Sequence, residues 1–266
     1  MAGLTARQAV ALYTTRNPFD SPAALRASNY SAVACGNLVR LLDWREPLPQ
    51  AKLADRALRG FLGGTSFSCV AGKAVVNAGA YRFGYYLGFG DRRSTEGLAR
   101  DLAAFVAERS SMKAPYSSFI AVFEETAGGD ERWFEAALWR QLEGLAELGS
   151  RHYSWNREVG ADPHETNFAF SFAGEAFFVV GLHPQSSRLS RRFFLPTLAF
   201  NAHAQFRHAR KSGAFQRITS IVRERELVLQ GSINPELREF GTRSEARQYS
   251  GRATEENWQC PFRVNS

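Results

Sequence analysis

The sequence is poor in lysine, cysteine and long apolar runs, and each shortage excludes a class of protein. No apolar run approaches the roughly 20 residues that a membrane helix needs. The N-terminal M-A-G-L-T-A-R lacks the charged start and apolar core of a signal peptide. Cys35, Cys69 and Cys260 form no CxxC or CxxCH pattern. We therefore expect a cytoplasmic protein with no membrane partner, disulfide framework, structural zinc site or covalently attached haem.

Arginine, not lysine, carries the positive charge. Only Lys52, Lys73, Lys113 and Lys211 are lysines among the 33 basic residues, and the net charge is +7. Such a charge is also typical of nucleic-acid-binding proteins. However, the arginines are spread along the chain, and no helix-turn-helix, RNP or zinc-finger pattern occurs. We interpret the charge as compositional bias and expect no nucleic-acid partner. If the protein did bind nucleic acid, its affinity for nucleic acid would fall steeply with salt concentration.

Hydrophobic periodicity predicts a single α+β domain over residues 1–266, with a mainly antiparallel sheet and packed helices. Residues 1–50 have an irregular pattern, and the segment around Cys69 is interpreted as a short strand or turn. Helices are predicted at 51–62, at 94–109 after a Ser94 cap, from the Asp130 cap onward, from Ala202 after an Asn201 cap, and at 215–229. Strands are predicted at 81–89, 118–123, 168–172, 176–182 and, between two prolines, 193–200.

Residues 181–210 gather the residue types that a haem site needs. The segment holds three of the five histidines and surrounds the apolar run Phe193–Phe200 with arginines. An imidazole can hold iron, apolar walls can cover the porphyrin, and guanidinium groups can meet the propionates. The residues concerned are His183, His203 and His208, with Arg188, Arg191, Arg192, Arg207 and Arg210.

Six motifs, read in order, resemble the YqcI/YcgG family. They are F-S-C (67–69), F-F-V-V-G-L-H-P-Q-S-S-R (177–188), F-N-A-H-A-Q-F (200–206), L-Q-G-S-I-N-P (229–235), Q-Y-S-G (248–251) and W-Q-C-P-F (258–262). Ser68 stands where a familiar form of the first motif has proline. The chain resembles in particular the haem-dependent L-arginine N-hydroxylase of D-cycloserine biosynthesis. The resemblance implies non-covalent haem b, dioxygen and conversion of L-arginine to Nω-hydroxy-L-arginine in antibiotic biosynthesis.

Hydroxylation of a guanidino nitrogen needs an activated oxygen species that no side chain supplies. A flavin would favour a G-x-G-x-x-G turn after a strand, and none is present. Mononuclear iron would want two histidines and a carboxylate, for which His183 and His203 with Glu175 or Asp162 are candidates without the usual H-x-D spacing. Haem is the simplest cofactor, and the electrons would come from an external donor.

His203 is the first candidate for the axial ligand, and His183 is the second. His203 lies on a predicted helix that fixes the ring, with Gln205 available to hydrogen-bond nearby groups. The histidine that does not bind iron would act catalytically by donating a proton to bound oxygen. If His203 is the ligand, this residue is His183. Cys69 and Cys260 remain rival ligands, because a thiolate also suits oxygenation.

Charged residues complete the predicted site. Propionate partners are Arg188 first, then Arg191, Arg192 and Arg207. A substrate guanidinium needs a carboxylate, and the sequence offers Glu124, Glu125, Asp162, Glu165 and Glu175 without choosing among them. The alternative function is a non-catalytic haem carrier or sensor, or an N-hydroxylase with another guanidino substrate.

Overall fold

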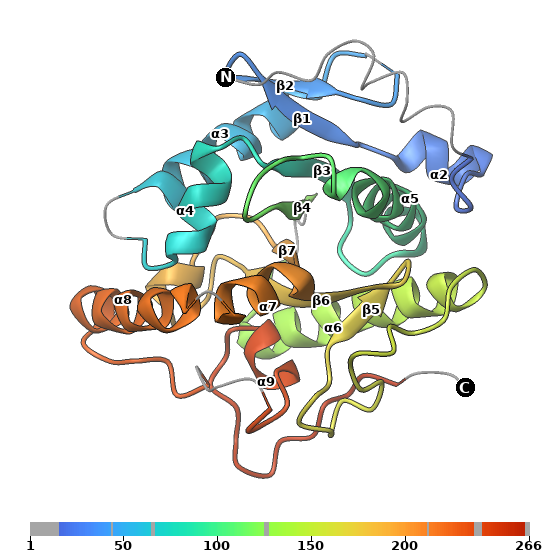
Figure 1. Ribbon diagram of the computed structural model, residues 1–266. Coiled ribbons are helices and arrows are strands. Elements are labelled where there is room, and N and C mark those ends of the chain that lie inside the picture. The colour runs from blue at the N-terminus through green and yellow to red at the C-terminus, as the bar shows by residue number, and fades with distance from the viewer. Residues whose placement is uncertain are drawn as a thin grey trace.

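A computed structural model describes residues 16–43, 45–64, 67–124, 128–211, 213–236 and 241–263. These residues form one seven-stranded sheet in the order β2-β1-β3-β4-β7-β6-β5 (Figure 1). The β3–β4 pair is parallel and the other pairs are antiparallel, which confirms the predicted α+β class with a mainly antiparallel sheet. The strands are β1 Ser31–Ala34, β2 Asn37–Arg40, β3 Tyr81–Leu87, β4 Ser118–Glu124, β5 Phe170–Phe172, β6 Glu175–Leu182 and β7 Thr197–Ala202.

Helices cover both faces of the sheet because its strands are apolar on both sides. The helices α5 and α6 pack on one face, around Phe119 and Phe200, and α3 and α4 pack on the other, around Phe83 and Ile120. None of the helices described is long and apolar enough to cross a bilayer. The helices are α2 Pro22–Ala27, α3 Pro49–Gly63, α4 Val70–Asn77, α5 Arg92–Arg109, α6 Glu131–Ser150, η1 Leu189–Arg191, α7 His203–Lys211, α8 Ala214–Gln230 and α9 Ala246–Tyr249.

The antiparallel pair β6–β7 positions the two halves of the 181–210 segment. Leu182 pairs with Thr197, and Phe177 pairs with Ala202. The chain therefore leaves β6 at one end of the pair and leaves β7 at the other end. At a rise of about 3.3 Å per residue, the two exits lie roughly 20 Å apart.

The predicted hairpin at 168–182 is confirmed, and a second hairpin was missed. Ala173 and Gly174 have φ of 52° and 78°, the left-handed conformation of a two-residue type I′ turn between β5 and β6. The prediction that residues 1–50 are irregular is wrong for 22–40, which form α2 and the β1–β2 hairpin. Cys35 and Gly36, with φ of 50° and 79°, make its turn in the same way.

Three local predictions also need correction. Asp91, not Ser94, caps α5, because its carboxylate accepts the Ser94 amide at 2.7 Å. Cys69 caps helix α4 and does not lie in a strand or turn. Asn201 caps no helix, because β7 continues to Ala202 and the Asn201 amide donates to the Phe178 and Ala199 carbonyls.

Candidate functional site

Residues 183–193, here named the site loop, follow β6 and fold back on themselves. Pro184 cannot donate to the sheet, so the strand ends before it. The His183 amide donates to the Arg191 carbonyl at 3.0 Å, and the Ser186 amide donates to the His183 carbonyl at 3.3 Å. These bonds bring His183 beside the short helix η1 and place Arg188 and Arg191 on the same loop.

The His183 side chain is 1% exposed, and neither ring nitrogen has a hydrogen-bond partner among the described residues. Its ring stacks on Phe134 of α6, with centroids 4.3 Å apart and an interplanar angle of 14°. Burial lowers the pKa of His183 to about 4, opposed by Glu131 and Asp130 and reinforced by Arg191. The imidazole is therefore neutral near pH 7. Leaving buried polar groups unsatisfied costs about 1–3 kcal/mol each, so these nitrogens point to an additional partner.

A pocket of about 790 Å³ lies at the start of α6, next to His183 in the chain. Its apolar lining includes Trp133, Pro184, Phe194 and Pro196. The charged residues of the lining are Asp130, Glu131, Arg132 and Arg252. The pocket thus combines apolar walls with groups of both charges. Its lining residue Pro184 directly follows the buried His183 in the chain.

The Arg188 side chain, on the site loop, belongs to a polar cluster with Glu226 and Ser232. It is 8% exposed and contacts the carboxylate of Glu226 on α8. Its Nη1 donates to Ser232 Oγ at 3.0 Å, and its Nη2 donates to the Ser232 carbonyl at 2.7 Å. Ser68 Oγ donates to the same Glu226 carboxylate at 2.8 Å. Arg188 is thus already paired with a carboxylate of its own chain.

Three segments that the sequence singled out converge on the site loop. Ser232 contacts Arg188, Ser68 contacts Glu226, the partner of Arg188, and Gln230 bonds with the backbone of Ser187 and Leu189. Arg191 donates to the Gly181, Tyr249 and Gln248 carbonyls at 3.0, 3.5 and 3.3 Å. Gly251 lies so close that an added Cβ would meet the Arg191 side chain at 3.3 Å. The quoted motifs around 67–69, 183–188, 229–232 and 248–251 therefore share one location.

The family model for YqcI/YcgG matches residues 58–263, which includes all of these segments. The chain belongs to the YqcI/YcgG family. It is similar to the uncharacterized protein YcgG of Bacillus subtilis (strain 168), with 27% identity over 234 residues that cover 82% of this chain and 90% of that protein. No solved structure matches this YqcI/YcgG chain.

The other predicted residues of this YqcI/YcgG protein lie at the opposite end of the β6–β7 pair. His203 is 4% exposed, and its Nε2 lies 3.0 Å from Glu245 Oε1. Tyr249 donates to the same oxygen at 2.6 Å. Burial raises the pKa of Glu245, although His203 and Tyr249 oppose this. His203 thus belongs to a satisfied hydrogen-bonded group.

Gln205 and Arg207 also have structural partners at that end. Gln205 Oε1 accepts the Ser117 amide at 2.9 Å, and Arg207 forms an ion pair with Glu158. On the site loop, Arg192 is exposed and donates to the Ser186 carbonyl at 2.9 Å.

The structure separates His183 from His203, so the two cannot face each other across one iron as proposed from the sequence. A mononuclear site built from both is excluded in the same way. In the part of the chain described, no group of three His, Cys, Asp or Glu is arranged to hold a metal ion. Of the acidic candidates, Glu175 pairs with Arg109 and Asp162 with His164, while Glu125 lies outside the described residues.

The two rival thiols are neutral groups, with Cys260 buried and Cys69 partly buried. Cys69 Sγ accepts the Gly72 amide at 3.3 Å, and burial raises its pKa despite that bond. Burial raises the pKa of Cys260 to about 12 in the core beside α6. Neither environment stabilises a thiolate, which is the form that binds iron.

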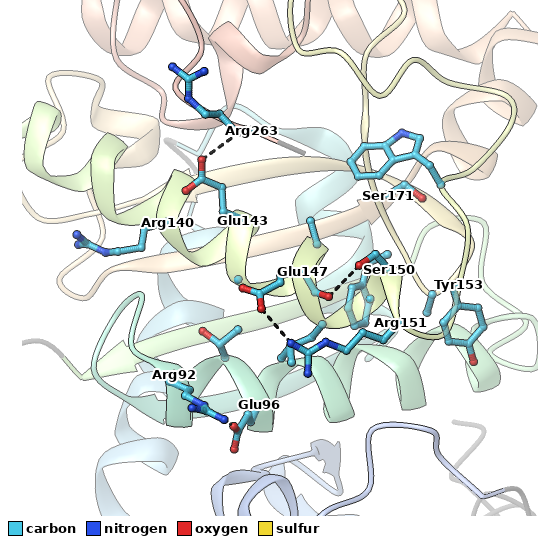
Figure 2. Close-up of a pocket in the computed structure, with 18 of the residues that line it drawn as sticks. Arg92, Glu96, Arg140, Glu143, Glu147, Ser150, Arg151, Tyr153, Ser171 and Arg263 are labelled. Carbon is cyan, nitrogen blue, oxygen red and sulfur yellow. Dashed lines mark hydrogen bonds and ion pairs between the residues drawn. The ribbon is translucent and has the colours of Figure 1, made fainter. Parts of the chain in front are cut away.

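A larger pocket, of about 900 Å³, lies elsewhere, along α6 beside α5 and β5. Figure 2 shows acidic and basic side chains alternating along it, with contacts from Glu143 to Arg263 and from Glu147 to Arg151. Neither pocket is lined by a site residue predicted from the sequence, but the smaller one includes Pro184, which directly follows His183. Sequence reasoning missed Glu226, which ends the charged run Arg223-Glu224-Arg225-Glu226 and carries no signal that distinguishes it from its neighbours.

Proposed function

We propose that this protein binds haem b through His183 and N-hydroxylates the guanidino group of L-arginine or a related compound, using dioxygen and an external electron donor. The observation that carries the cofactor assignment is the buried imidazole, whose two nitrogens have no partner among the residues that the structure describes. The substrate class rests on the resemblance of the motifs to guanidino N-hydroxylases. The proposal replaces His203 with His183 as the axial ligand.

His183 fits the ligand role in three respects. Its neutral form carries the lone pair that binds iron. The stack on Phe134 and the backbone bond to Arg191 fix the ring. Trp133 and Phe194, together with the prolines of the adjacent pocket, provide apolar cover for a porphyrin. His203 fits poorly because binding iron through Nε2 would break its contact with Glu245.

Haem, when bound, supplies the reductive activation of dioxygen that no side chain can. The chain's part is to bind and orient the substrate and to limit the access of water. Asp130 and Glu131 line the pocket and are suited to a guanidinium. Glu131 Oε1 accepts the Ser187 amide and hydroxyl at 2.8 and 2.7 Å, which leaves Oε2 for a substrate. These two carboxylates are better placed than the acids proposed from the sequence.

The test is single-turnover oxidation by the haem-loaded protein. Wild type is mixed with L-arginine and a reductant under air, and the product is examined by mass spectrometry for one added oxygen. We expect Nω-hydroxy-L-arginine from wild type. Glu131→Gln should raise the L-arginine concentration needed for half-maximal product formation about tenfold or more, since a charge-assisted contact is lost. The exposed Glu147→Gln on the same helix should behave as wild type.

Haem binding without an arginine-dependent product would reject the enzyme and favour a haem carrier or sensor. Absence of a Soret band in wild type would reject the cofactor itself.

A further inference from the structure

Helix α8 is attached to the molecule by an unusual contact. It lies at the periphery beside α7 and α4 (Figure 1). Among its described side chains only Glu226, at 3% exposure, is buried, whereas Leu227 and Val228 are 52% and 84% exposed. A helix normally buries an apolar stripe, not a single carboxylate. The apolar residues Phe215, Ile218, Val222 and Leu229 are only partly buried, so Glu226 is the one fully enclosed side chain in the described part of α8.

Glycine residues in the left-handed conformation flank α8 on both sides. Gly213 and Gly231 have φ of 70° and 71°, and a Cβ at either would meet nothing within 4 Å. Glycine is thus favoured at these positions by backbone conformation and not by lack of space. Both ends of the helix are points where the chain direction can change.

Three side chains from outside α8 hold the Glu226 carboxylate, and we name them the carboxylate cradle. They are Ser68, which donates at 2.8 Å, Arg188 and Ser190. Burial alone would raise the pKa of Glu226, but the donors from Ser190, Arg188 and Ser68 outweigh it and lower the pKa. Glu226 is therefore held as a carboxylate.

The carboxylate cradle has binding capacity that Glu226 does not use. Arg188 Nε is buried without an acceptor among the described residues, although a guanidinium binds a carboxylate best through two parallel bonds. Arg191 brings a second positive charge close to Glu226, while its own hydrogen bonds go to backbone carbonyls. Two cations and one carboxylate leave a local excess of positive charge. A free carboxylate could approach both donors of Arg188 without the restraint of a helix.

We propose that the carboxylate cradle is a binding site for the carboxylate of a small-molecule ligand, with Glu226 as an internal occupant. A ligand carboxylate displaces Glu226, and α8 then moves away from the site loop. Because the ligand carboxylate replaces that of Glu226, Arg188 stays paired with a carboxylate, which avoids the large cost of an isolated buried charge. Only the identity of the ligand rests on the proposed function, since L-arginine and the haem propionates both carry this group.

Hydrogen–deuterium exchange of the full wild-type chain tests the displacement directly. Sodium propionate serves as the probe because it is the free counterpart of the glutamate side chain, and sodium chloride at equal ionic strength is the control. We expect propionate to accelerate amide exchange in residues 215–230 saturably, by about fivefold or more, as local opening becomes easier. Equal exchange in propionate and chloride would overturn the proposal.

Variants separate the cradle from general effects of charge. Glu226→Gln removes the charged competitor, so propionate should bind about tenfold more tightly than to wild type. The exposed Glu224→Gln on the same helix should leave propionate affinity unchanged. Arg188→Gln, with its fold checked by circular dichroism, should abolish the response. Unchanged affinity in a folded Glu226→Gln would contradict internal occupancy, and the wild-type comparison decides if that variant does not fold.

Further ligands distinguish the two sources of the carboxylate. L-arginine is compared with agmatine, which lacks the carboxylate, and haem is compared with its dimethyl ester. Opening by L-arginine but not agmatine assigns the cradle to the substrate, and opening by haem but not its ester assigns it to propionate. A response to propionate alone would uphold the cradle and count against the ligands of the proposed function.

Discussion

The two ends of the β6–β7 pair each hold a buried histidine, and they differ in how its nitrogens are satisfied. His203, 4% exposed, lies against Glu245, which Tyr249 also contacts. His183, 1% exposed, has an aromatic ring on one face and no hydrogen-bond partner among the described residues. Native proteins rarely leave buried polar atoms unpaired. The satisfied histidine therefore has a structural explanation, whereas the unsatisfied one is accounted for only by the binding role that we propose.

Removing the partner of the satisfied histidine should have the largest effect on stability. Glu245→Ala leaves His203 and Tyr249 without their shared acceptor inside the core. Leaving a buried polar group unsatisfied costs about 1–3 kcal/mol, so the loss of the acceptor shared by two groups should lower the unfolding free energy by about 2–6 kcal/mol. Urea denaturation measures this loss, with the exposed Glu256→Ala as control. A loss below about 1 kcal/mol, typical of exposed pairs, would contradict the structural role assigned to the His203 end.

The unsatisfied histidine should make the haem-free chain sensitive to acid. Burial lowers the folded-state pKa of His183 from 6.5 to about 4, so the unfolded chain binds the proton more readily. Its contribution to stability is present above pH 6.5 and is lost as the pH falls toward 4, by about 3 kcal/mol in total. The difference in unfolding free energy between wild type and His183→Phe should follow this window. A difference independent of pH would show that His183 is protonated normally.

At pH 7, His183→Phe should have a smaller effect on the unfolding free energy. Unlike most substitutions in a core, it should stabilise the protein. His183→Phe keeps a ring against Phe134 and removes two unsatisfied nitrogens. We expect the haem-free variant to be more stable than wild type by about 1 kcal/mol. Thermal unfolding measures the gain, and His208→Phe at an exposed position is the control. Destabilisation of a correctly folded His183→Phe would mean that the nitrogens have partners in the haem-free chain.

Local sequence patterns predicted much of the sheet and the long helices. Phe134, Leu138, Leu142 and Leu145 form the buried stripe of α6 as their spacing indicated. The β1–β2 hairpin was missed because its turn uses Cys35-Gly36 in place of a common Asn-Gly pair. Helix α4 was missed because cysteine is an uncommon cap and its sequence contains glycine and β-branched residues.

The candidate site was predicted only in part, because its geometry depends on strand register. The sequence singled out His183 and Arg188, but it could not show that antiparallel pairing would carry His203 to the far end. It also could not show that Arg188 would pair with the carboxylate of Glu226, which is remote in the chain. Side-chain satisfaction is a tertiary property, so the order of the two histidines as ligand candidates reversed once contacts were known.

Haem titration of matched variants tests the central claim most directly. The Soret absorption of wild type, His183→Ala and His203→Ala is followed against haem concentration, with circular dichroism to confirm that each is folded. We predict that wild type and folded His203→Ala bind haem with similar affinity, whereas His183→Ala loses the wild-type Soret band. Retention of that band in His183→Ala, together with its loss in folded His203→Ala, would contradict the account.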